Sequence, residues 1–408
     1  MSSQFFAGLD IGTSSVKGVV AQVKDGRLLP RLFLKEISSG VRKGAIVDLV
    51  EASPSVVRVV SEIRRFSKSA ADNLYVGIGT SEIKSQVSKG IVAVSRADNE
   101  INQEDKDRVI RASQAVNISA NRTIIHSDVR EYMVDGVGDI SDPVGLSGTR
   151  LEAVSLIIDA FSAHFKSLVK AVELSGGEIR NTILTPLAAS RAVLTKRQKE
   201  LGVAMLDIGG GTTGLAVYDE GKLIGAAKFP AGSDNISKDI GIGLKVPVSV
   251  GDEIKLKYGS AISKSVGAKE SIDMASLYPE GKGQVSRRFV CEIIESRLAE
   301  ILEFANNEIK AMNRSGSLAG GVVLAGGGSK LPGISELSRQ ELKLTSQLAL
   351  PDSSFWDPQS VEINSSFDDP EYAVCLGLVV QAMNDEGIAR SSFSPLSAAK
   401  KWLKYLQP

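Results

Sequence analysis

The stretch that decides the fold is "AMLDIGGGTTG", which runs from Ala204 to Gly214. An apolar run typical of a buried strand ends in Asp207, and three consecutive glycines follow it. Three glycines in a row are unusual in a simple turn, because glycine loses backbone entropy on folding and contributes no side chain to packing. The free N–H groups of such a loop are suited to phosphate. Taken alone, the stretch leaves a phosphate loop and a flexible turn both open.

The same pattern occurs near the start of the chain as "AGLDIGTSSVKG", Ala7 to Gly18. In both copies Leu-Asp-Ile-Gly precedes small hydroxylated residues and a second apolar run, which ends at a hairpin turn sequence (KDG at 24–26, DEG at 219–221). This order predicts an antiparallel meander, whereas a P-loop or a Rossmann fingerprint leads from its glycines into a helix. The repeat therefore predicts duplicated domains whose phosphate loops face each other.

A third glycine-rich stretch is "GGVVLAGGGSKLPGI", Gly320 to Ile334. It reads as a buried strand, a triple glycine and a helix opened by Pro332. Glycines let the backbone approach a planar ring or a phosphate closely. A generic strand-to-helix turn is the alternative interpretation, and the two phosphate loops already present favour a nucleotide loop.

Composition limits the classes of protein. The chain has 408 residues, enough for two or more domains, and its 48 basic and 48 acidic side chains argue against broad nucleic-acid binding. Two cysteines, Cys291 and Cys375, and two histidines argue against a Cys/His metal site and fit a reducing cytoplasm. The N-terminus does not resemble a signal peptide. The longest nearly uncharged apolar stretch, Tyr372–Met383, is too short to span a bilayer and predicts a buried helix.

The three loops, in the order phosphate-1, phosphate-2 and adenosine, resemble those of the actin/Hsp70/sugar-kinase superfamily. Between the first two loops, "YMVDG" and "GDISDPVGLSGTRLEA" (within Tyr132–Ala153) are similar to the inserted subdomain of the FtsA family, the actin-like cell-division proteins of bacteria. The similarity covers nearly the whole chain. It implies an α/β fold of duplicated actin-like (ribonuclease-H-like) ATPase domains with an FtsA-type inserted 1C subdomain and a C-terminal amphipathic helix.

The resemblance also implies a division of the chain. Subdomain 1A is expected at 1–80 and 160–200, on either side of the inserted subdomain 1C at 81–159. Subdomain 2A is expected at 201–228 and 301–368, around a mostly helical subdomain 2B at 229–300. A return helix to 1A (369–384), a linker (385–394) and a membrane-targeting helix (395–408) complete the map.

The family binds ATP with Mg²⁺ between the two halves, and the resemblance implies that Asp10 and Asp207 hold the metal through waters. In "VGDEIKLKYG" (Val250–Gly259) the ribose-binding carboxylate falls on Asp252, with Glu253 as the alternative. The full set of expected nucleotide-binding residues is Asp10, Gly12, Thr13, Ser14, Ser15, Lys17, Asp207, Gly209, Gly210, Gly211, Thr212, Thr213, Gly232, Asp252, Lys255, Gly326, Gly327, Gly328 and Ser329.

One position departs from the superfamily pattern. Actin-like ATPases and Hsp70 proteins usually place Glu or Gln before the proline of "TPLAASRAVL" (Thr185–Leu194), where it positions the attacking water, and here the residue is Thr185. A neutral hydroxyl orients water less well than a carboxylate or an amide. We therefore expect firm ATP binding and at most slow hydrolysis, with ATP acting as a switch for assembly, and we name no catalytic residue.

The C-terminal stretch "SPLSAAKKWLKYLQP" has the composition of an interfacial membrane helix. At about 100° per residue its apolar side chains fall on one face, with lysines beside them. This agrees with the position of the membrane-targeting helix in the FtsA family. The residues expected to meet lipid are Leu396, Ala399, Lys400, Lys401, Trp402, Leu403, Lys404 and Leu406. A helix packed on the protein's own body is the alternative.

The expected partners also follow from the resemblance. In the FtsA family subdomain 2B receives the C-terminal peptide of FtsZ, and "SRRFVCEIIESRLAEIL" (Ser286–Leu302) matches the helix that bears this contact. Arg297 and Glu300 fall on its binding positions, and Arg287 and Arg288 add positive charge. Further expected partners are other copies of the chain in actin-like filaments, inner-membrane lipid and later division proteins, with no nucleic acid.

These expectations describe a peripheral protein at the division site, on the cytoplasmic face of the bacterial inner membrane. Two other classes of the same superfamily are weighed against it. A PilM-type pilus-assembly adaptor would share the loops but not the "DPVGLSGTRLEA" stretch or the terminal helix. A sugar or acetate kinase would need a catalytic acid facing a substrate cleft. An Hsp70 chaperone is excluded by chain length.

Overall fold

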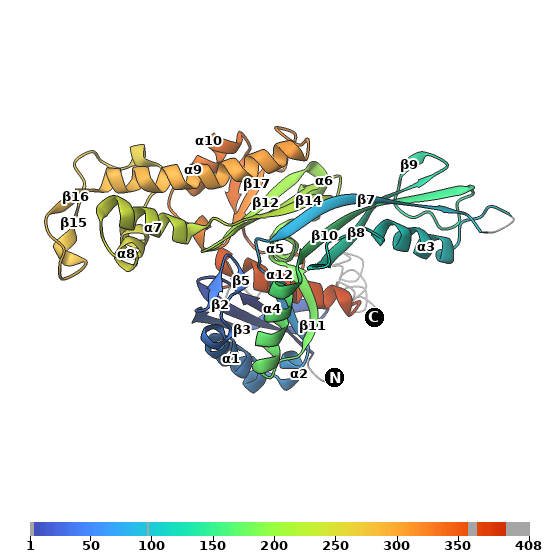
Figure 1. Cartoon of the computed structure of the whole chain (residues 1–408), viewed down its shortest axis with the longest axis horizontal. Helices are drawn as coiled ribbons and strands as arrows, with labels where there is room; N and C mark the ends of the chain where they lie inside the picture. Colours follow the sequence, from blue (N-terminus) through green and yellow to red (C-terminus); the bar gives the residue numbers. More distant parts are fainter. Residues whose placement is uncertain (1–3, 96–97, 358–364, 389–408) are drawn as a thin grey trace, which may run out of the picture.

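The computed structural model describes residues 4–95, 98–357 and 365–388. Two five-stranded mixed sheets dominate it, and they have the same strand order: β11-β6-β1-β2-β3 in the first half and β18-β17-β12-β13-β14 in the second (Figure 1). The strands of the first sheet are β1 (Phe5–Ile11), β2 (Ser15–Lys24), β3 (Arg27–Ile37), β6 (Leu74–Ile78) and β11 (Ile179–Leu184). Those of the second are β12 (Val203–Ile208), β13 (Thr213–Asp219), β14 (Lys222–Phe229), β17 (Val322–Ala325) and β18 (Ser346–Leu348).

Both predicted meanders are confirmed. β1, β2 and β3 pair antiparallel in sequence order, and so do β12, β13 and β14. The hairpin turns have positive φ at both central residues, 50° and 72° at Asp25 and Gly26, and 52° and 75° at Glu220 and Gly221. This is the two-residue turn whose twist matches the strands that it joins. The repeat seen in the sequence is therefore a repeat of topology.

Two helices lie between the sheets. α5 (Thr185–Val193) follows β11, and α12 (Ala373–Asp385) closes the described part of the chain; they pack against each other and share one core with residues of both halves. The buried helix predicted at Tyr372–Met383 is thus confirmed, with Cys375 buried on it. Gly377 allows the close approach, because a Cβ there would lie 1.7 Å from the carbonyl oxygen of Ala188.

The remaining helices cover the outer faces. α1 (Leu49–Phe66) packs on the first sheet beside α4 (Ser162–Leu174), and the side chain of Asp48 caps its N-terminus. The second half carries α7 (Ser233–Leu244), α8 (Val248–Tyr258) and the long α9 (Arg287–Ala311), which share a core with the second sheet. The smaller elements are α2 (Lys68–Ala71), α6 (Lys196–Leu201), α10 (Ile334–Leu342), β4 (Val41–Arg42), β5 (Ala45–Ile46), β15 (Ser271–Asp273) and β16 (Gln284–Ser286).

A separate sheet is inserted after β6 and extends away from the rest of the chain, on the right of Figure 1. Its strands lie in the order β7 (Ile83–Ala93), β10 (Arg150–Phe161), β8 (Arg122–Val134) and β9 (Val137–Ile140), with α3 (Gln103–Gln114) packed on them over a small core. Asn102 and Asp105 form a reciprocal capping box at the start of α3. An ion pair of 3.0 Å between Lys222 and Asp139 joins this insert to β14.

The third glycine-rich loop differs from the prediction at its end. A 3₁₀ turn (Gly327–Lys330) follows β17, and α10 begins at Ile334 rather than at Pro332. Gly326 and Gly333 have positive φ angles, 80° and 83°. Only glycine adopts such angles without strain, so the chain leaves the strand in a compact double turn before the helix starts.

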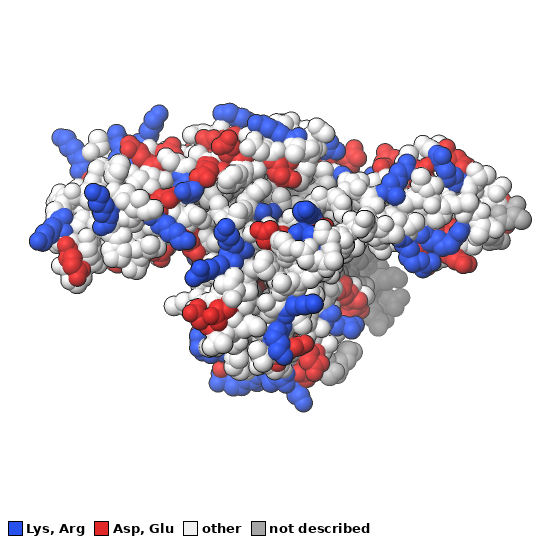
Figure 2. Space-filling view, in the orientation of Figure 1, with Lys and Arg blue, Asp and Glu red and all other residues white. Residues whose placement is uncertain are grey.

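The remaining expectations concern surface charge and membrane contact. Acidic and basic side chains are interspersed on the face drawn in Figure 2, in keeping with the balanced composition. No helix in the described ranges combines the length and the apolarity needed to cross a bilayer. The predicted terminal helix at 395–408, with all its lipid-facing residues, lies outside the described residues.

The contact between α12 and α5 generates a stability prediction. Gly377→Ala should lower the free energy of unfolding by about 1–3 kcal/mol, because overpacking displaces neighbouring backbone, even though alanine favours a helix. Urea denaturation followed by circular dichroism measures the change. Gly138→Ala is the matched control, since a Cβ there meets only side-chain atoms at 3.6 Å or more. Equal stability of the two variants would contradict the packing argument.

Candidate functional site

One cavity of about 390 Å³ lies between the two halves of the molecule. Its walls come from the loops that follow β1, β12 and β17, from α7 and α8, and from the segment that leads into α12. The lining mixes glycine backbone with five lysines and five carboxylates. Its size falls within the range of small-molecule sites.

The two hairpin loops in this wall have the same internal geometry. Gly12 N donates to Ser15 O at 3.0 Å in the first loop, and Gly209 N donates to Thr212 O at 2.9 Å in the second. Each loop follows an aspartate at the end of the first strand of its meander, Asp10 or Asp207. The duplication therefore extends to the hydrogen bonds of the loops.

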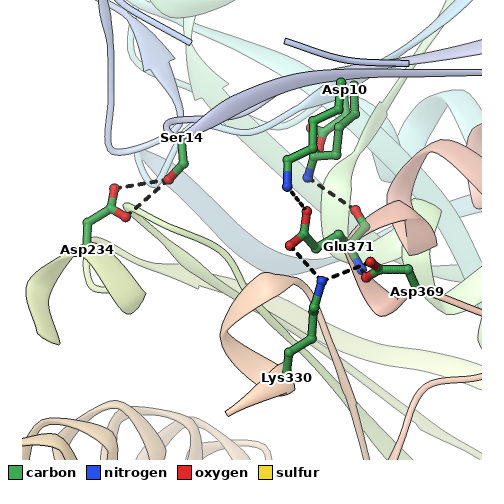
Figure 3. A network of polar contacts seen from close by, with 8 residues as sticks. Asp10, Ser14, Asp234, Lys330, Asp369 and Glu371 are labelled. Carbon is green, nitrogen blue, oxygen red and sulfur yellow. Dashed lines mark hydrogen bonds and ion pairs between the residues drawn. The ribbon is translucent and has the colours of Figure 1, made fainter. Parts of the chain in front are cut away.

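The two loops also contact each other at the cavity, whose wall they share. A Cβ at Gly210 would lie 1.8 Å from Ser14 Oγ, so any side chain at this position would push the halves apart. Ser14 Oγ donates to Asp234, at 3.1 Å from Oδ1, which links the first loop to the start of α7 (Figure 3). The glycines of the second loop are therefore needed for the close approach of the two halves.

The two aspartates lie in unlike surroundings. Asp10 is 7% exposed, with Lys17 Nζ 3.5 Å from its Oδ2. Burial raises the pKa of the Asp207 carboxyl, and the positive charge of Lys228 opposes this shift. Gly326 stands against the same carboxylate, since a Cβ there would lie 2.5 Å from Asp207 Oδ1. Within the described ranges, no group of three or more His, Cys, Asp or Glu side chains is placed to hold a metal ion.

A charged network closes one side of the cavity (Figure 3). Glu371 pairs with Lys35 at 2.5 Å and with Lys330 at 3.2 Å, and Lys330 also pairs with Asp369 at 2.9 Å. Burial alone would raise the pKa of the Glu371 carboxyl, but the hydrogen bond from Lys35 and the charge of Lys330 lower it below its usual value. Lys17 Nζ donates to the backbone oxygen of Glu371 at 3.1 Å. The network therefore connects β2 and β3, which carry Lys17 and Lys35, to the segment before α12.

The structure separates the two alternatives in the middle of α8, Asp252 and Glu253. Asp252 lines the cavity, accepts from Lys255 and Ser237 at 2.7 Å each, and has a lowered pKa because these hydrogen bonds outweigh its burial. Glu253 is absent from the cavity lining and pairs with Lys257 at 2.5 Å. Of these two carboxylates, only Asp252 lines the cavity.

A buried contact lies at the position where the superfamily carries its water-orienting residue. Lys228 Nζ donates to Thr185 Oγ1 at 2.7 Å, from β14 of the second half to α5 of the first. Burial lowers the pKa of the Lys228 ammonium, and the charges of Asp207 and Asp10 oppose that effect. The hydroxyl of Thr185 is thus engaged by a cation.

Most of the nucleotide-binding residues expected from the sequence line this cavity. Three do not: Thr213 donates to Ala231 O, Gly232 packs beneath the second loop, and Ser329 donates to Gly326 O. The predicted residues in the lining are Asp10, Gly12, Thr13, Ser14, Ser15, Lys17, Asp207, Gly209, Gly210, Gly211, Thr212, Asp252, Lys255, Gly326, Gly327 and Gly328.

The sequence interpretation missed several lining residues, among them Lys35, Lys228, Asp234, Lys330 and Glu371. Lys330 could have been predicted from the sequence, because it follows the third glycine loop and its Ser329. Lys228 and Glu371 reach the cavity only through the pairing of β14 and through the return of the chain to the first half.

A second, open groove runs along α9 on the helical part of the second half. Arg297 pairs there with Asp239 at 2.5 Å and with Glu300. Arg287 and Arg288, which were predicted beside them, lie outside the groove, because Arg287 pairs with Glu270 and Arg288 donates to Val266 O. The groove is lined by Asp239, Phe289, Glu292, Ile293, Ser296, Arg297 and Glu300.

Solved structures resemble the fold at low sequence identity. The PilM–PilN type IV pilus biogenesis complex gives a TM-score of 0.66 at 14% identity, covering 93% of this chain and 98% of the other. MreB5 of Spiroplasma citri bound to AMPPNP gives 0.56 at 12% identity, covering 94% and 98%. These likenesses establish an actin-like fold.

Sequence comparison is more specific. Residues 204–377 match the family described as cell division protein FtsA, and residues 80–158 match the SHS2 domain inserted in FtsA. FtsA of Pseudomonas aeruginosa is 32% identical over 99% of this chain and 98% of its own length. FtsA of Bacillus subtilis is 32% identical (93% and 83%), and that of Escherichia coli K12 is 30% identical (84% and 83%). With its duplicated actin-like sheets and inserted domain, the chain belongs to the FtsA family of cell division proteins.

Proposed function

We propose that this protein is an ATP-switched adaptor that assembles into filaments and tethers FtsZ to the cytoplasmic face of the inner membrane, where later division proteins join it. The observation that carries the proposal is the pair of equivalent hairpin loops that come from the two halves and meet in the wall of one cavity. Membership of the FtsA family supports the cellular role, and the AMPPNP bound by the actin-like MreB5 supports a nucleotide in the cavity.

The residues of the cavity fit ATP. The loops at 12–15 and 209–212 offer backbone N–H groups and hydroxyls to the phosphates, and the loop at 326–328 together with Asp252 offers a surface for adenosine and ribose. Asp10 and Asp207 fit Mg²⁺ held through water, because this ion is commonly bound by one or two carboxylates together with the substrate's phosphates. The metal would neutralise phosphate charge, while the chain's own residues position the nucleotide and close the cavity.

The groove on α9 is the proposed FtsZ contact. Phe289 and Ile293 supply apolar surface, and Arg297 supplies a guanidinium that is held in place by Asp239. Such a groove fits a short peptide that lays apolar side chains on the helix and a carboxylate on the arginine. The subdomain boundaries proposed from the sequence would assign this groove to 2B and the inserted sheet to 1C.

Assembly and membrane attachment complete the proposal. The inserted sheet, proposed as 1C, and the helical part, proposed as 2B, lie at opposite ends of the molecule in Figure 1. This placement suits a head-to-tail contact between 1C of one copy and 2B of the next. The segment 395–408 would bind lipid reversibly on its own, whereas a filament with many such segments would stay bound through avidity.

The first prediction concerns the membrane. The full chain should sediment with vesicles that contain anionic lipid, more completely with ATP than without, and should carry a fluorescent FtsZ tail peptide into the pellet. Deletion of 395–408 should remove sedimentation, because the apolar face and its lysines supply the attraction. Vesicles of neutral lipid serve as the control for charge. Equal sedimentation of the deletion variant would refute the anchor.

The second prediction concerns the groove. Arg297→Glu should weaken binding of the FtsZ tail peptide about tenfold or more, since a charge-assisted hydrogen bond becomes a repulsion. Fluorescence anisotropy measures the affinity. Arg339→Glu is the matched control, because Arg339 also pairs with a glutamate one helical turn away and lies outside the groove. A dissociation constant within twofold of the unaltered protein would remove Arg297 from the contact.

The third prediction concerns hydrolysis. Thr185→Gln should raise the rate of phosphate release about tenfold or more, because an amide orients the attacking water better than a hydroxyl that is already engaged by Lys228. Thr185→Ser keeps the hydroxyl and should stay as slow as the unaltered protein. Turnover of the unaltered protein at the rate of a metabolic ATPase would contradict the role of ATP as a slow switch.

A further inference from the structure

Lys228 is the exception among the lysines of the cavity. The other four each have a carboxylate partner: Lys17 with Asp10, Lys35 and Lys330 with Glu371, and Lys255 with Asp252. Lys228 is only 9% exposed, and within the described ranges no carboxylate oxygen lies within 4.0 Å of its Nζ. Its partner in the structure is the neutral hydroxyl of Thr185, at 2.7 Å.

This arrangement is costly for the protein without a ligand. An ammonium has three hydrogens to donate, and a buried charge destabilises the fold unless it is paired and hydrogen-bonded. One hydroxyl accepts one of the three hydrogens and brings no negative charge. Asp207 and Asp10 act on the ammonium from beyond 4.0 Å. An anion in the cavity would supply the missing acceptors and a negative charge in direct contact.

The position of Lys228 in the cavity indicates which part of a bound nucleotide it would contact. It lies beside Thr185, and Thr185 lies beside Asp10, because a Cβ at Gly77 would be 3.0 Å from Thr185 Cγ2 and 3.5 Å from Asp10 Oδ1. This is the end of the cavity between the two aspartates. Asp252 and Leu256, on α8, lie in the part of the wall proposed for adenosine.

We propose that Lys228 binds the terminal phosphate of ATP and gives the site its preference for ATP over ADP. The inference rests on the proposed nucleotide site and adds a phosphate ligand from the third strand of the second meander. The terminal phosphate would then lie beside the contact between Lys228 and Thr185, which joins the two halves. A nucleoside diphosphate would leave the ammonium with Thr185 as its partner.

A purely structural role makes a different prediction. If Lys228 served only to tie β14 to α5, its loss would destabilise the ligand-free protein and would affect ATP and ADP alike. As a phosphate ligand, it costs stability in the absence of nucleotide, so its replacement by an apolar side chain of similar length should leave the thermal midpoint unchanged or raised.

The test compares AMPPNP and ADP, both with Mg²⁺, in calorimetric titrations of the full chain. Lys228→Met should weaken AMPPNP about tenfold or more and ADP less than about twofold, as expected for loss of one charge-assisted contact to the terminal phosphate. The thermal midpoint without nucleotide should not fall. Lys222→Met is the matched control on the same strand, since Lys222 pairs with Asp139 outside the cavity, and it should bind like the unaltered protein.

Thr185→Val separates the two roles further, because it removes the tie and keeps the ammonium. The proposal predicts that this variant retains the preference for AMPPNP, whereas a structural tie predicts that it behaves like Lys228→Met. Equal weakening of both nucleotides by Lys228→Met, or no change in either, would overturn the assignment of Lys228. Failure of the unaltered chain to bind AMPPNP would instead overturn the nucleotide site itself.

Discussion

Two carboxylates, the buried Asp10 and the partly buried Asp207, line a shared cavity from opposite halves of the molecule and set the main constraint on this structure. Asp10 and Asp207 lie near the ends of equivalent central strands. Lys17 pairs with Asp10 at 3.5 Å, whereas Lys228 makes no ion pair with Asp207 and only opposes, by its charge, the rise that burial causes in the pKa of that carboxyl. The hairpin loops after them are limited to small residues, because the halves approach until a side chain at Gly210 would collide with Ser14. The site therefore exists only when both halves are in place.

The packing between the halves follows from this constraint. α5 and α12 hold the sheets at a fixed separation, and Gly377 lets the backbones meet. Glu371 stands just before α12 and connects Lys35 of the first sheet to Lys330 of the third loop. A change at Lys35 or Lys330 in the cavity would therefore alter the contacts of Glu371, in the segment that leads into α12. This contact is the route that the proposed nucleotide switch would use to act on assembly and attachment.

Much of the fold was predictable because its signals are local. Asp-Gly and Glu-Gly turns defined both meanders, and Asn102 with Asp105 marked the start of α3. The three glycine loops predicted the cavity, since glycines cluster where backbones come close to each other or to a ligand. Lys228, Asp234 and Glu371 were missed because long-range pairing brings them to the cavity, and no local pattern reports such pairing. Arg287 and Arg288 carry the expected charge, but Glu270 and the backbone oxygen of Val266 engage them.

The most direct test of the central claim is a crystal structure of the full chain grown with AMPPNP and Mg²⁺. The account predicts one nucleotide between the halves, with its phosphates against the loops at 12–15 and 209–212 and the metal between Asp10 and Asp207. A cavity without nucleotide at saturating AMPPNP, or a nucleotide bound elsewhere on the molecule, would contradict it.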